Sequence, residues 1–312
     1  MSGRSIEIES GSWRAWILAT RPKTLPAAIV PVWAGAVLSF RLSGAIDWFL
    51  LTFTVLSALS IQIATNFFND VIDFRKGTDT AKRVGPTRAA ASGLIHEKAM
   101  MLGGITMLFI AVALGTPLVA AGGWPILLIG VVSLFLSYGY TGGPFPLAYR
   151  GMGEAFVVVF FGLIAVGGSV LVQTGHWPWS SVLLGLQVGL YSTVLIAVNN
   201  LRDVEEDRAS GKKTLAVKLG AIFAKWEIAA FCLLPLLMGV LWIPLEGWLG
   251  ALLFPLLLLP LSLLLTYRVA STPPSEKYNK FLAMGALQLI GFVIFFTIAL
   301  VDVRGIAAAG LP

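Results

Sequence analysis

The chain has 312 residues, of which 57% are hydrophobic and 12% charged, and its formal net charge is +6. Soluble domains carry about 25% charged residues, so this composition excludes an ordinary soluble protein and indicates a membrane protein. The single cysteine, Cys232, excludes an intramolecular disulfide and a cysteine-based metal site, and the presence of only two histidines argues against a His-rich metal site. We expect a lipid bilayer around the chain and no nucleic-acid partner.

Residues 1–20 form a polar and amphipathic N-terminal segment. Met1–Ser12 is polar and lacks the apolar core of a cleavable signal, whereas Trp13–Thr20 has the pattern of a helix at the membrane interface. Nine apolar stretches follow, which predict an all-α polytopic membrane protein with a single membrane-embedded domain over residues 1–312. The predicted transmembrane helices are Leu25–Phe40, Trp48–Phe68, Ala99–Ala121, Trp124–Tyr140, Gly153–Gln173, Trp179–Asn200, Trp226–Pro244, Trp248–Tyr267 and Phe281–Val301.

The distribution of basic residues predicts the orientation of these helices. With nine spans, every Lys and Arg except Arg41 and Arg304 falls on the same side of the membrane as the N-terminus. Cytoplasmic connections carry the excess of Lys and Arg, so we expect a cytoplasmic N-terminus and a C-terminus outside. The N-terminal segment shows no transit-peptide pattern, which favours a prokaryotic cytoplasmic (inner) membrane.

The second and sixth predicted helices end in similar clusters of acids and asparagines on the cytoplasmic side. The clusters are Asn66-Phe-Phe-Asn69-Asp70-Val-Ile-Asp73 and Asn199-Asn200-Leu-Arg202-Asp203-Val-Glu205-Glu206-Asp207. In the first, Asn66, Asp70 and Asp73 share one helical face because they lie at positions i, i+4 and i+7. In the second, Asn199, Asp203 and either Glu206 or Asp207 have the same spacing. We interpret the clusters as two copies of one binding device.

Two facing helices of this kind would bring at least four carboxylates into one pocket, where they repel one another unless a cation joins them. Carboxylate oxygens with room for water suit Mg²⁺, which also takes oxygens from substrate phosphates. Basic residues follow both clusters, so the pattern predicts a diphosphate site with apolar helices behind it for a hydrophobic tail. The alternative is that the acids are solvated helix ends paired with nearby lysines. Two matched clusters favour the binding site.

These motifs resemble those of a known family. Asn69-Asp70-x-x-Asp73, Gly77-x-Asp79, Asp203-x-x-x-Asp207 and Gly211-Lys212-Lys213-Thr214 resemble the UbiA superfamily of intramembrane prenyltransferases. The blocks Arg21-Pro-Lys-Thr-Leu-Pro-Ala-Ala28, Gly77-Thr-Asp-Thr80, Tyr149-Arg-Gly-Met-Gly-Glu154 and Asn199-Asn-Leu-Arg-Asp203 resemble its branch of 1,4-dihydroxy-2-naphthoate polyprenyltransferases, which act in menaquinone synthesis. The chain departs from the broad pattern at the third acid of the first motif, where Gly77 stands and Asp79 follows two positions later.

The resemblance implies nine helices around a central cavity, with the acidic motifs beneath cytoplasmic cap loops. It also implies Mg²⁺-dependent transfer of a polyprenyl group from polyprenyl diphosphate to an aromatic acceptor, 1,4-dihydroxy-2-naphthoate, with loss of the carboxylate to give demethylmenaquinone. The implied catalytic and metal-binding residues are Asp70, Asp73, Asp203 and Asp207.

Further residues are candidates for contact with the diphosphate or the acceptor. They are Lys23, Asn66, Asn69, Arg83, Arg88, Tyr140, Asn199 and Lys213. Plainer roles remain open for some of them: Lys23 as a positive-inside anchor, Arg88 as a solvated loop charge and Tyr140 as an interface-belt residue. Arg150 and Glu154, four residues apart, are predicted either to form a local ion pair or to bind the acceptor.

Three other functions compete with this hypothesis. A transporter would carry polar groups along several spans, whereas these acids gather at one face. A phosphoalcohol transferase would show an Asp-Gly-x-x-Ala-Arg run, which the sequence lacks. A prenyltransferase of the same superfamily with another acceptor, such as 4-hydroxybenzoate, homogentisate or a lipid phosphate, would share the diphosphate device.

Overall fold

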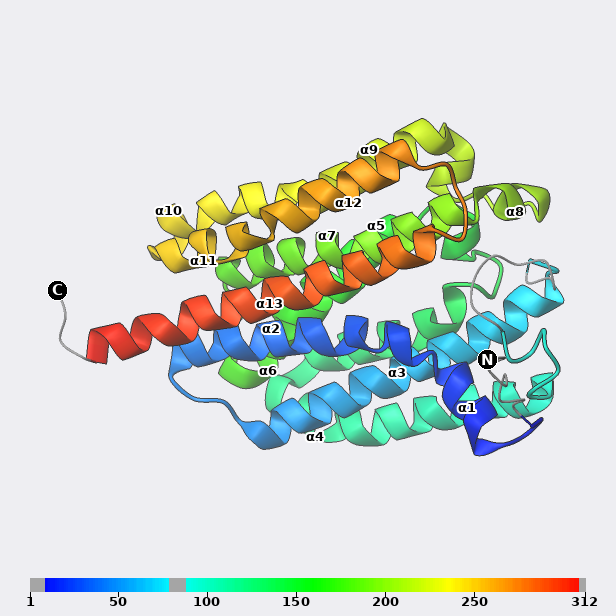
Figure 1. Ribbon diagram of the computed structural model, residues 1–312. Helices are drawn as coiled ribbons and strands as arrows, with labels where there is room; N and C mark the ends of the chain where they lie inside the picture. The colour runs from blue at the N-terminus through cyan, green and yellow to red at the C-terminus, as the bar shows by residue number, and fades with distance from the viewer. Residues whose placement is uncertain (1–8, 79–87, 309–312) are drawn as a thin grey trace, which may run out of the picture.

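A computed structural model of the protein describes residues 9–78 and 88–308, with side chains as far as Val301. In these ranges the chain is helical with connecting loops and has no strand, which confirms the all-α prediction (Figure 1). The α-helices are α1 (Trp13–Thr20), α2 (Pro26–Ser43), α3 (Trp48–Arg75), α4 (Glu97–Gly139), α5 (Gly153–Val157), α6 (Ala165–Thr174), α7 (Trp179–Arg202), α8 (Val204–Ala209), α9 (Leu215–Met238), α10 (Trp242–Glu246), α11 (Leu249–Leu253), α12 (Leu259–Ser271) and α13 (Tyr278–Ala308). Short segments join them: η1 (Pro22–Thr24), η2 (Leu147–Tyr149), the π-helix η3 (Val158–Ile164), η4 (Gly239–Leu241) and η5 (Pro255–Leu258).

Eight helical stretches of the described residues are long and apolar enough to cross a membrane. One of them, α4, has 43 residues, about twice the length that a single span needs. It is interrupted at Gly123, whose φ of 68° and ψ of −156° lie outside the helical region. The break falls between the predicted third and fourth spans. Counted as two helices, α4 brings the described spans into agreement with the predicted nine.

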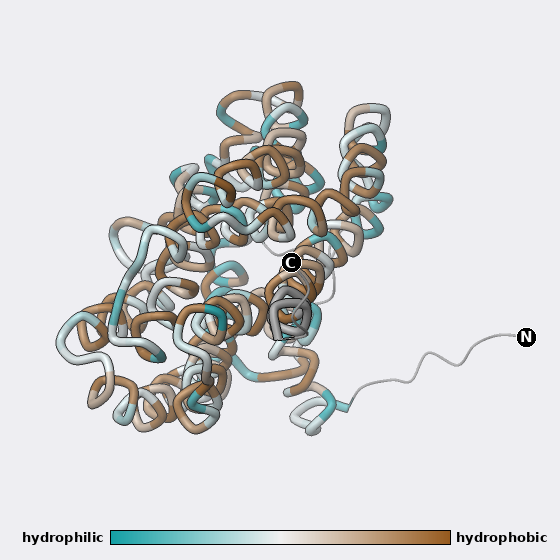
Figure 2. Tube along the Cα trace, turned by 90° about the vertical axis from the view of Figure 1, so that its left-hand side faces the viewer, coloured by the Kyte–Doolittle hydropathy of each residue, from teal (hydrophilic) through white to brown (hydrophobic). Residues whose placement is uncertain are grey.

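The helices run between two ends of the bundle. In Figure 1 the C-terminal ends of α3 and α7 lie beside α1 and α8 at one end, and α13 stops at the other. Large apolar side chains face outward along the bundle, including Trp124 at 74% exposure and Ile222 at 77%. Figure 2 looks along the helices and shows hydrophobic residues through most of them. Such an outer surface suits lipid rather than water, so this is an integral membrane protein.

Two elements differ in extent from the sequence prediction. α9 is interrupted at Gly220, whose φ of 86° and ψ of 165° lie outside the helical region, so the helix predicted to begin at Trp226 begins just after Gly220, and a short helical stretch from Leu215 precedes it. Lys225 lies inside this helix, and its ammonium group donates to the carbonyl of Ala270 at 2.8 Å. The predicted interfacial segment does form a helix, α1. Its N-cap is Ser12, whose side chain accepts a hydrogen bond from the backbone N–H of Ala15.

α7 is the most enclosed helix and carries the second acidic cluster at its end. In an apolar stretch of 18 residues of α7, 72% of the residues are buried, whereas in the corresponding stretch of α4 11% are buried. Gln187 of α7 fixes its depth by donating to the carbonyl of Pro235 at 2.8 Å and accepting from the indole N–H of Trp242 at 2.9 Å. These bonds satisfy a polar side chain that is fully buried. The cluster at the end of α7 is therefore held by a rigid element.

Glycines let α7 approach the π-helix η3 backbone to backbone. A Cβ added at Gly162 of η3 would lie 2.3 Å from the carbonyl oxygen of Gly185 and 2.7 Å from Cα of Gly189, both on α7. Both distances are shorter than van der Waals contact, and the neighbouring atoms are main chain. Any side chain at this position would push the two helices apart.

Gly162→Ala is therefore expected to destabilise the protein by about 1–3 kcal/mol, the usual cost of overpacking. The matched control is Gly130→Ala, because a Cβ added at Gly130 meets nothing within 4 Å. Thermal unfolding of both variants in the same detergent measures the difference. Equal melting temperatures for the two would show that this close approach is not needed for stability.

Candidate active site

Asp70 and Asp73 lie in the last turns of α3 and are buried, with exposures of 1% and 7%. The carboxylate of Asp70 accepts two backbone hydrogen bonds, from the N–H of Ala89 at 3.1 Å and of Ala90 at 3.3 Å. These donors belong to the loop before α4, which closes over the end of α3. These two bonds give the oxygens of the buried carboxylate protein partners in place of water.

Asp73 is linked to a second loop. It accepts a hydrogen bond from the hydroxyl of Tyr149 at 2.8 Å, and Nη2 of Arg88 lies 3.9 Å from its other oxygen. The hydroxyl of Thr78 lies 3.0 Å from that of Tyr149. Burial, together with the negative charge of Asp73, raises the pKa of Tyr149, so the phenol keeps its proton and remains a donor. The first acidic pair is thus covered from two directions.

The second cluster begins with an ion pair. The guanidinium of Arg202 binds both carboxylate oxygens of Asp203, at 2.6 and 2.7 Å, and its side chain is fully buried. The same guanidinium also donates to Oδ1 of Asn199 at 2.6 Å and of Asn279 at 2.8 Å. A planar fork of this kind fixes a carboxylate strongly. Asp203 is therefore already charge-paired within the protein.

Asp207, rather than Glu206, is the second buried acid of this cluster. α7 ends at Arg202, and α8 starts again after Asp203, whose backbone is not helical. Asp207 is 6% exposed, while Glu206 is only partly buried. Of the two acids that the sequence left as alternatives, Asp207 is therefore the one inside the protein.

The environment of Asp207 favours an added cation. Nζ of Lys212 lies 3.3 Å from its Oδ1, whereas Oδ2 is buried and has no hydrogen-bond partner. Burial raises the pKa of Asp207 to about 6, although Lys212 acts in the opposite direction. Asp73 is among the negative charges that act on Asp207, so the two acidic pairs lie within electrostatic range of each other. A positive ion between the pairs would keep Asp207 ionised.

The residues present fit Mg²⁺ by the type of donor they offer. Within residues 9–78 and 88–301, no three His, Cys, Asp or Glu side chains lie close enough together to hold one ion. Mg²⁺ is usually bound by one or two carboxylates and completes its shell with water and substrate phosphates. The acidic pairs, and the unpartnered Oδ2 of Asp207 in particular, match that mode of binding rather than an all-protein cage.

The asparagines of the candidate site contact protein groups. Nδ2 of Asn66 donates to the carbonyl of Thr20 at 2.9 Å and to the hydroxyl of Thr24 at 3.1 Å, which ties α3 to the N-terminal segment. Asn69 accepts a hydrogen bond from the hydroxyl of Thr141. With Asn199 bound to Arg202, all three asparagines position neighbouring segments around the acids.

The basic side chains predicted to contact the diphosphate or the acceptor do not all lie at the acids. Arg88 lies at the first acidic pair, whereas Lys23 and Lys213 are exposed at the surface, and Arg83, like Asp79, lies outside the described residues. Arg21, which stands beside Lys23 before the first predicted span, has a charge that acts on Asp70. Arg21 also has a φ of 53°, a conformation that non-glycine residues rarely adopt.

Arg150 and Glu154 have different partners. The guanidinium of Arg150 lies 3.9 Å from the ring centre of Phe145, and the carboxylate of Glu154 accepts a hydrogen bond from Nδ2 of Asn200 at 2.8 Å. The local ion pair is therefore not formed. Gly151, with a φ of 71°, interrupts helical geometry between the two residues, so their i, i+4 spacing does not bring them together.

Three aromatic rings lead away from the acids. The ring of Tyr140 lies 5.1 Å from that of Phe156, which stacks on Phe160 at 4.5 Å. Tyr140 also lies in the electrostatic range of Glu154, Asp73 and Asp207. Phe156 precedes the π-helix η3, and Phe160 lies within it. π-Helical turns are frequent at functional sites, and no pattern in the sequence indicates this one.

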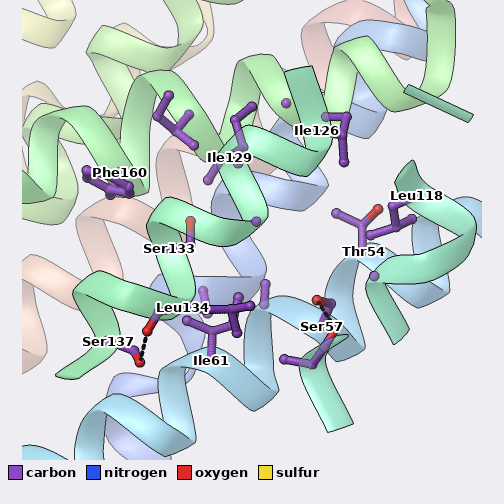
Figure 3. A pocket seen from close by; sticks show the side chains of 18 of the residues that line it. Thr54, Ser57, Ile61, Leu118, Ile126, Ile129, Ser133, Leu134, Ser137 and Phe160 are labelled. Atoms are coloured by element: carbon purple, nitrogen blue, oxygen red, sulfur yellow. Dashed lines mark hydrogen bonds between the residues drawn. The ribbon is translucent and has the colours of Figure 1, made fainter. Parts of the chain in front are cut away.

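A cavity of about 500 Å³ begins next to these rings. It lies between α2, α3, both halves of α4, η3 and α6, and its walls are largely apolar (Figure 3). Gln62 and Thr65, within one turn of Asn66, line its end near the acids, and Thr54, Leu118 and Ile126 line its far part. The size is typical of pockets that bind small organic molecules. An amphiphile could place a charged head at the acids and a hydrocarbon tail in this cavity.

Comparisons with known proteins identify the family to which the chain is similar. The UbiA prenyltransferase family model matches residues 28–287. A Bacillus subtilis protein named 1,4-dihydroxy-2-naphthoate octaprenyltransferase is 38% identical over 201 residues, which span 64% of this chain and 64% of that relative. A Haemophilus influenzae protein of the same name is 32% identical over 244 residues, which span 74% of this chain and 79% of the relative.

Solved structures show the same fold. A UbiA homolog from Archaeoglobus fulgidus, bound to DMAPP and Mg²⁺, matches with a TM-score of 0.66 at 14% identity and covers 91% of this chain and 99% of that one. The apo structure of a UbiA homolog from Aeropyrum pernix matches with a TM-score of 0.66 at 13% identity, over 90% of this chain and 98% of that one. At these identities the likeness establishes the arrangement of helices.

Proposed function

This chain belongs to the UbiA prenyltransferase family, and on that premise we propose that it transfers a polyprenyl group from its diphosphate to 1,4-dihydroxy-2-naphthoate. The carboxylate of the acceptor is lost, and the product is demethylmenaquinone. The observation that carries the proposal is the pair of buried acidic clusters, one in the last turns of α3 and one at the end of α7, together with an apolar cavity whose wall on α3 ends at Thr65, five residues before Asp70. The names of the relatives in Bacillus subtilis and Haemophilus influenzae support the acceptor.

A polyprenyl diphosphate is complementary to the chemistry of this site. Its diphosphate would lie at Asp70, Asp73, Asp203 and Asp207 with Arg88 and Lys212 beside it, and its hydrocarbon chain would fill the cavity. The four carboxylates would hold Mg²⁺, which would neutralise the negative charge of the diphosphate as it leaves. The presence of DMAPP and Mg²⁺ in the homologue from Archaeoglobus fulgidus supports this arrangement.

The aromatic rings suit the developing positive charge on the donor. Cleavage of an allylic C–O bond gives a carbocation, and the faces of Tyr140, Phe156 and Phe160 attract cations. The loops over the acids would exclude water, which would otherwise capture the cation. We further propose that the acidic end faces the cytoplasm, where most of the Lys and Arg residues lie.

Ser133→Phe is expected to lower transfer from a long-chain donor by about tenfold or more, while transfer from DMAPP changes little. Ser133 lines the middle of the cavity, and a phenyl ring there displaces several methylene groups of the tail, each worth about 0.8 kcal/mol of burial. The matched control is Leu128→Phe, an exposed position on the same half of α4. The kcat/KM for the two donors measures the effect. Equal losses of kcat/KM for the two donors would show that the hydrocarbon tail does not lie in this cavity.

The proposed function is tested by release of diphosphate from a polyprenyl diphosphate by the purified protein with Mg²⁺. We expect release that depends on added 1,4-dihydroxy-2-naphthoate. A transporter would release no diphosphate under any of these conditions, and that result would reject the proposal.

A further inference from the structure

Glu154 is a buried carboxylate that the transfer described so far does not use. It lies in the first turn of α5 and is 3% exposed. One oxygen, Oε1, accepts the hydrogen bond from Nδ2 of Asn200 at 2.8 Å. The other, Oε2, is buried and has no hydrogen-bond partner in the described part of the chain. An ionised carboxylate would lack a donor there and a protonated one would lack an acceptor, so Oε2 is open to a polar partner.

The position of Glu154 fits that requirement. A Cβ added at the preceding residue, Gly153, would lie 3.1 Å from the hydroxyl of Tyr140, the first ring of the aromatic series. Tyr140 in turn lies within electrostatic range of Asp73 and Asp207 as well as Glu154. Glu154 therefore lies beside Tyr140, the residue that links the acids to the aromatic rings.

We infer that Glu154 accepts the proton of the acceptor's ring hydroxyl adjacent to the carboxylate-bearing carbon, and that Asn200 orients it for this. The inference rests on the proposed function, because it assigns a residue to the acceptor of that reaction. The ring hydroxyl of the acceptor would be the hydrogen-bond donor that Oε2 lacks. A carboxylate placed in this way acts as a general base, a role worth typically 10²–10⁴-fold in rate.

The proton transfer has a chemical purpose. As the hydroxyl proton moves to Oε2, the oxygen forms a ketone, and the carboxylate-bearing ring carbon bonds to the allylic carbon of the donor. The allylic C–O bond breaks, and diphosphate leaves with that electron pair. The resulting ring is a β-keto acid: its C–CO₂ bond breaks, the electron pair moves through the ring to the ketone oxygen, and Glu154 returns its proton to that oxygen. Donor and acceptor become prenylated diol, CO₂ and diphosphate, and Glu154 is unchanged.

The test compares acceptors of different acidity with Glu154→Gln, using the full-length protein, Mg²⁺ and a long-chain prenyl diphosphate. With 1,4-dihydroxy-2-naphthoate we expect kcat to fall by about 10²–10⁴-fold. With a ring-fluorinated naphthoate, whose hydroxyl ionises more readily, we expect a clearly smaller deficit. Glu154→Asp, which keeps the carboxylate, should recover part of the rate. The control is Glu205→Gln, an exposed glutamate at the same end that pairs with Arg208.

Equal deficits with both acceptors, or no deficit, would overturn the inference, because a purely structural role cannot depend on the acidity of the acceptor. Wild-type protein that fails to prenylate either naphthoate would instead reject the proposed function, so the two failures are distinct. A measurement on the wild type alone covers the case in which the variants misfold. The isomer methylated on the hydroxyl next to the carboxylate should not be prenylated, whereas the isomer methylated on the other hydroxyl should be. Prenylation of both isomers would overturn the inference.

Discussion

Asp70→Asn and Asp207→Asn are each expected to lower prenyl transfer by at least about 10³-fold while leaving the protein folded in detergent. Each substitution removes one negative charge from a different helix, so each weakens the site from its own side. Loss of a carboxylate that holds a metal at a leaving diphosphate removes several kcal/mol of charge stabilisation, and about 1.4 kcal/mol corresponds to tenfold in rate. Initial rates with saturating donor and Mg²⁺ measure the loss.

Asp203→Asn is a less clean test of the second pair. Arg202 is fully buried and bound to both oxygens of Asp203, so this substitution leaves a buried guanidinium without its counter-charge. Breaking a buried ion pair in this way typically costs about 3–5 kcal/mol. We expect Asp203→Asn to lower both activity and melting temperature, but Asp207→Asn to lower activity alone. Full activity in both Asp70→Asn and Asp207→Asn would contradict the assignment of the metal and diphosphate site.

Removal of divalent cations is expected to stop turnover, and added Mg²⁺ is expected to restore it. Burial raises the pKa of Asp207 to about 6, although Lys212 lies 3.3 Å from it, so its charged form gains from an added cation. A diphosphate adds further negative charge to the same pocket, so the donor should bind well only together with Mg²⁺. Steady-state rates before and after chelation measure this effect.

A binding measurement separates the metal's role in holding the donor from its role in the chemical step. The donor should raise the melting temperature in Mg²⁺ and much less after chelation, since a ligand stabilises the folded state according to its affinity. Undiminished turnover in excess chelator would show that the carboxylates do not act through a metal.

Hydropathy and charge were sufficient to predict most of the fold. The break between the predicted third and fourth spans coincides with Gly123, because the polar-poor run there is too long for one crossing and a glycine permits the turn. The helix that contains Trp226 starts earlier than predicted, because a lysine limits an apolar span in the sequence but does not end a helix. The long side chain of Lys225 reaches the carbonyl of Ala270.

The candidate site was predictable only in part, for reasons of sequence distance and local backbone geometry. Helical spacing identified Asp70 and Asp73, which lie on one element. It could not choose between Glu206 and Asp207, because the positions three and four residues after Asp203 both lie on its face of a helix. The bond from Tyr149 to Asp73 joins residues 76 positions apart through a loop, and no periodic pattern reports such a contact.

The central claim is that this chain joins a polyprenyl diphosphate to a hydroxynaphthoate. It is tested most directly by the mass of the product that the purified protein forms with Mg²⁺ and a long-chain donor. 1,4-Dihydroxy-2-naphthoate and 4-hydroxybenzoate are offered in parallel. We predict a prenylated naphthalenediol that has lost the carboxylate, and little product from the benzoate. Transfer to 4-hydroxybenzoate alone would contradict the assigned acceptor, and absence of any prenylated product would contradict the transfer itself.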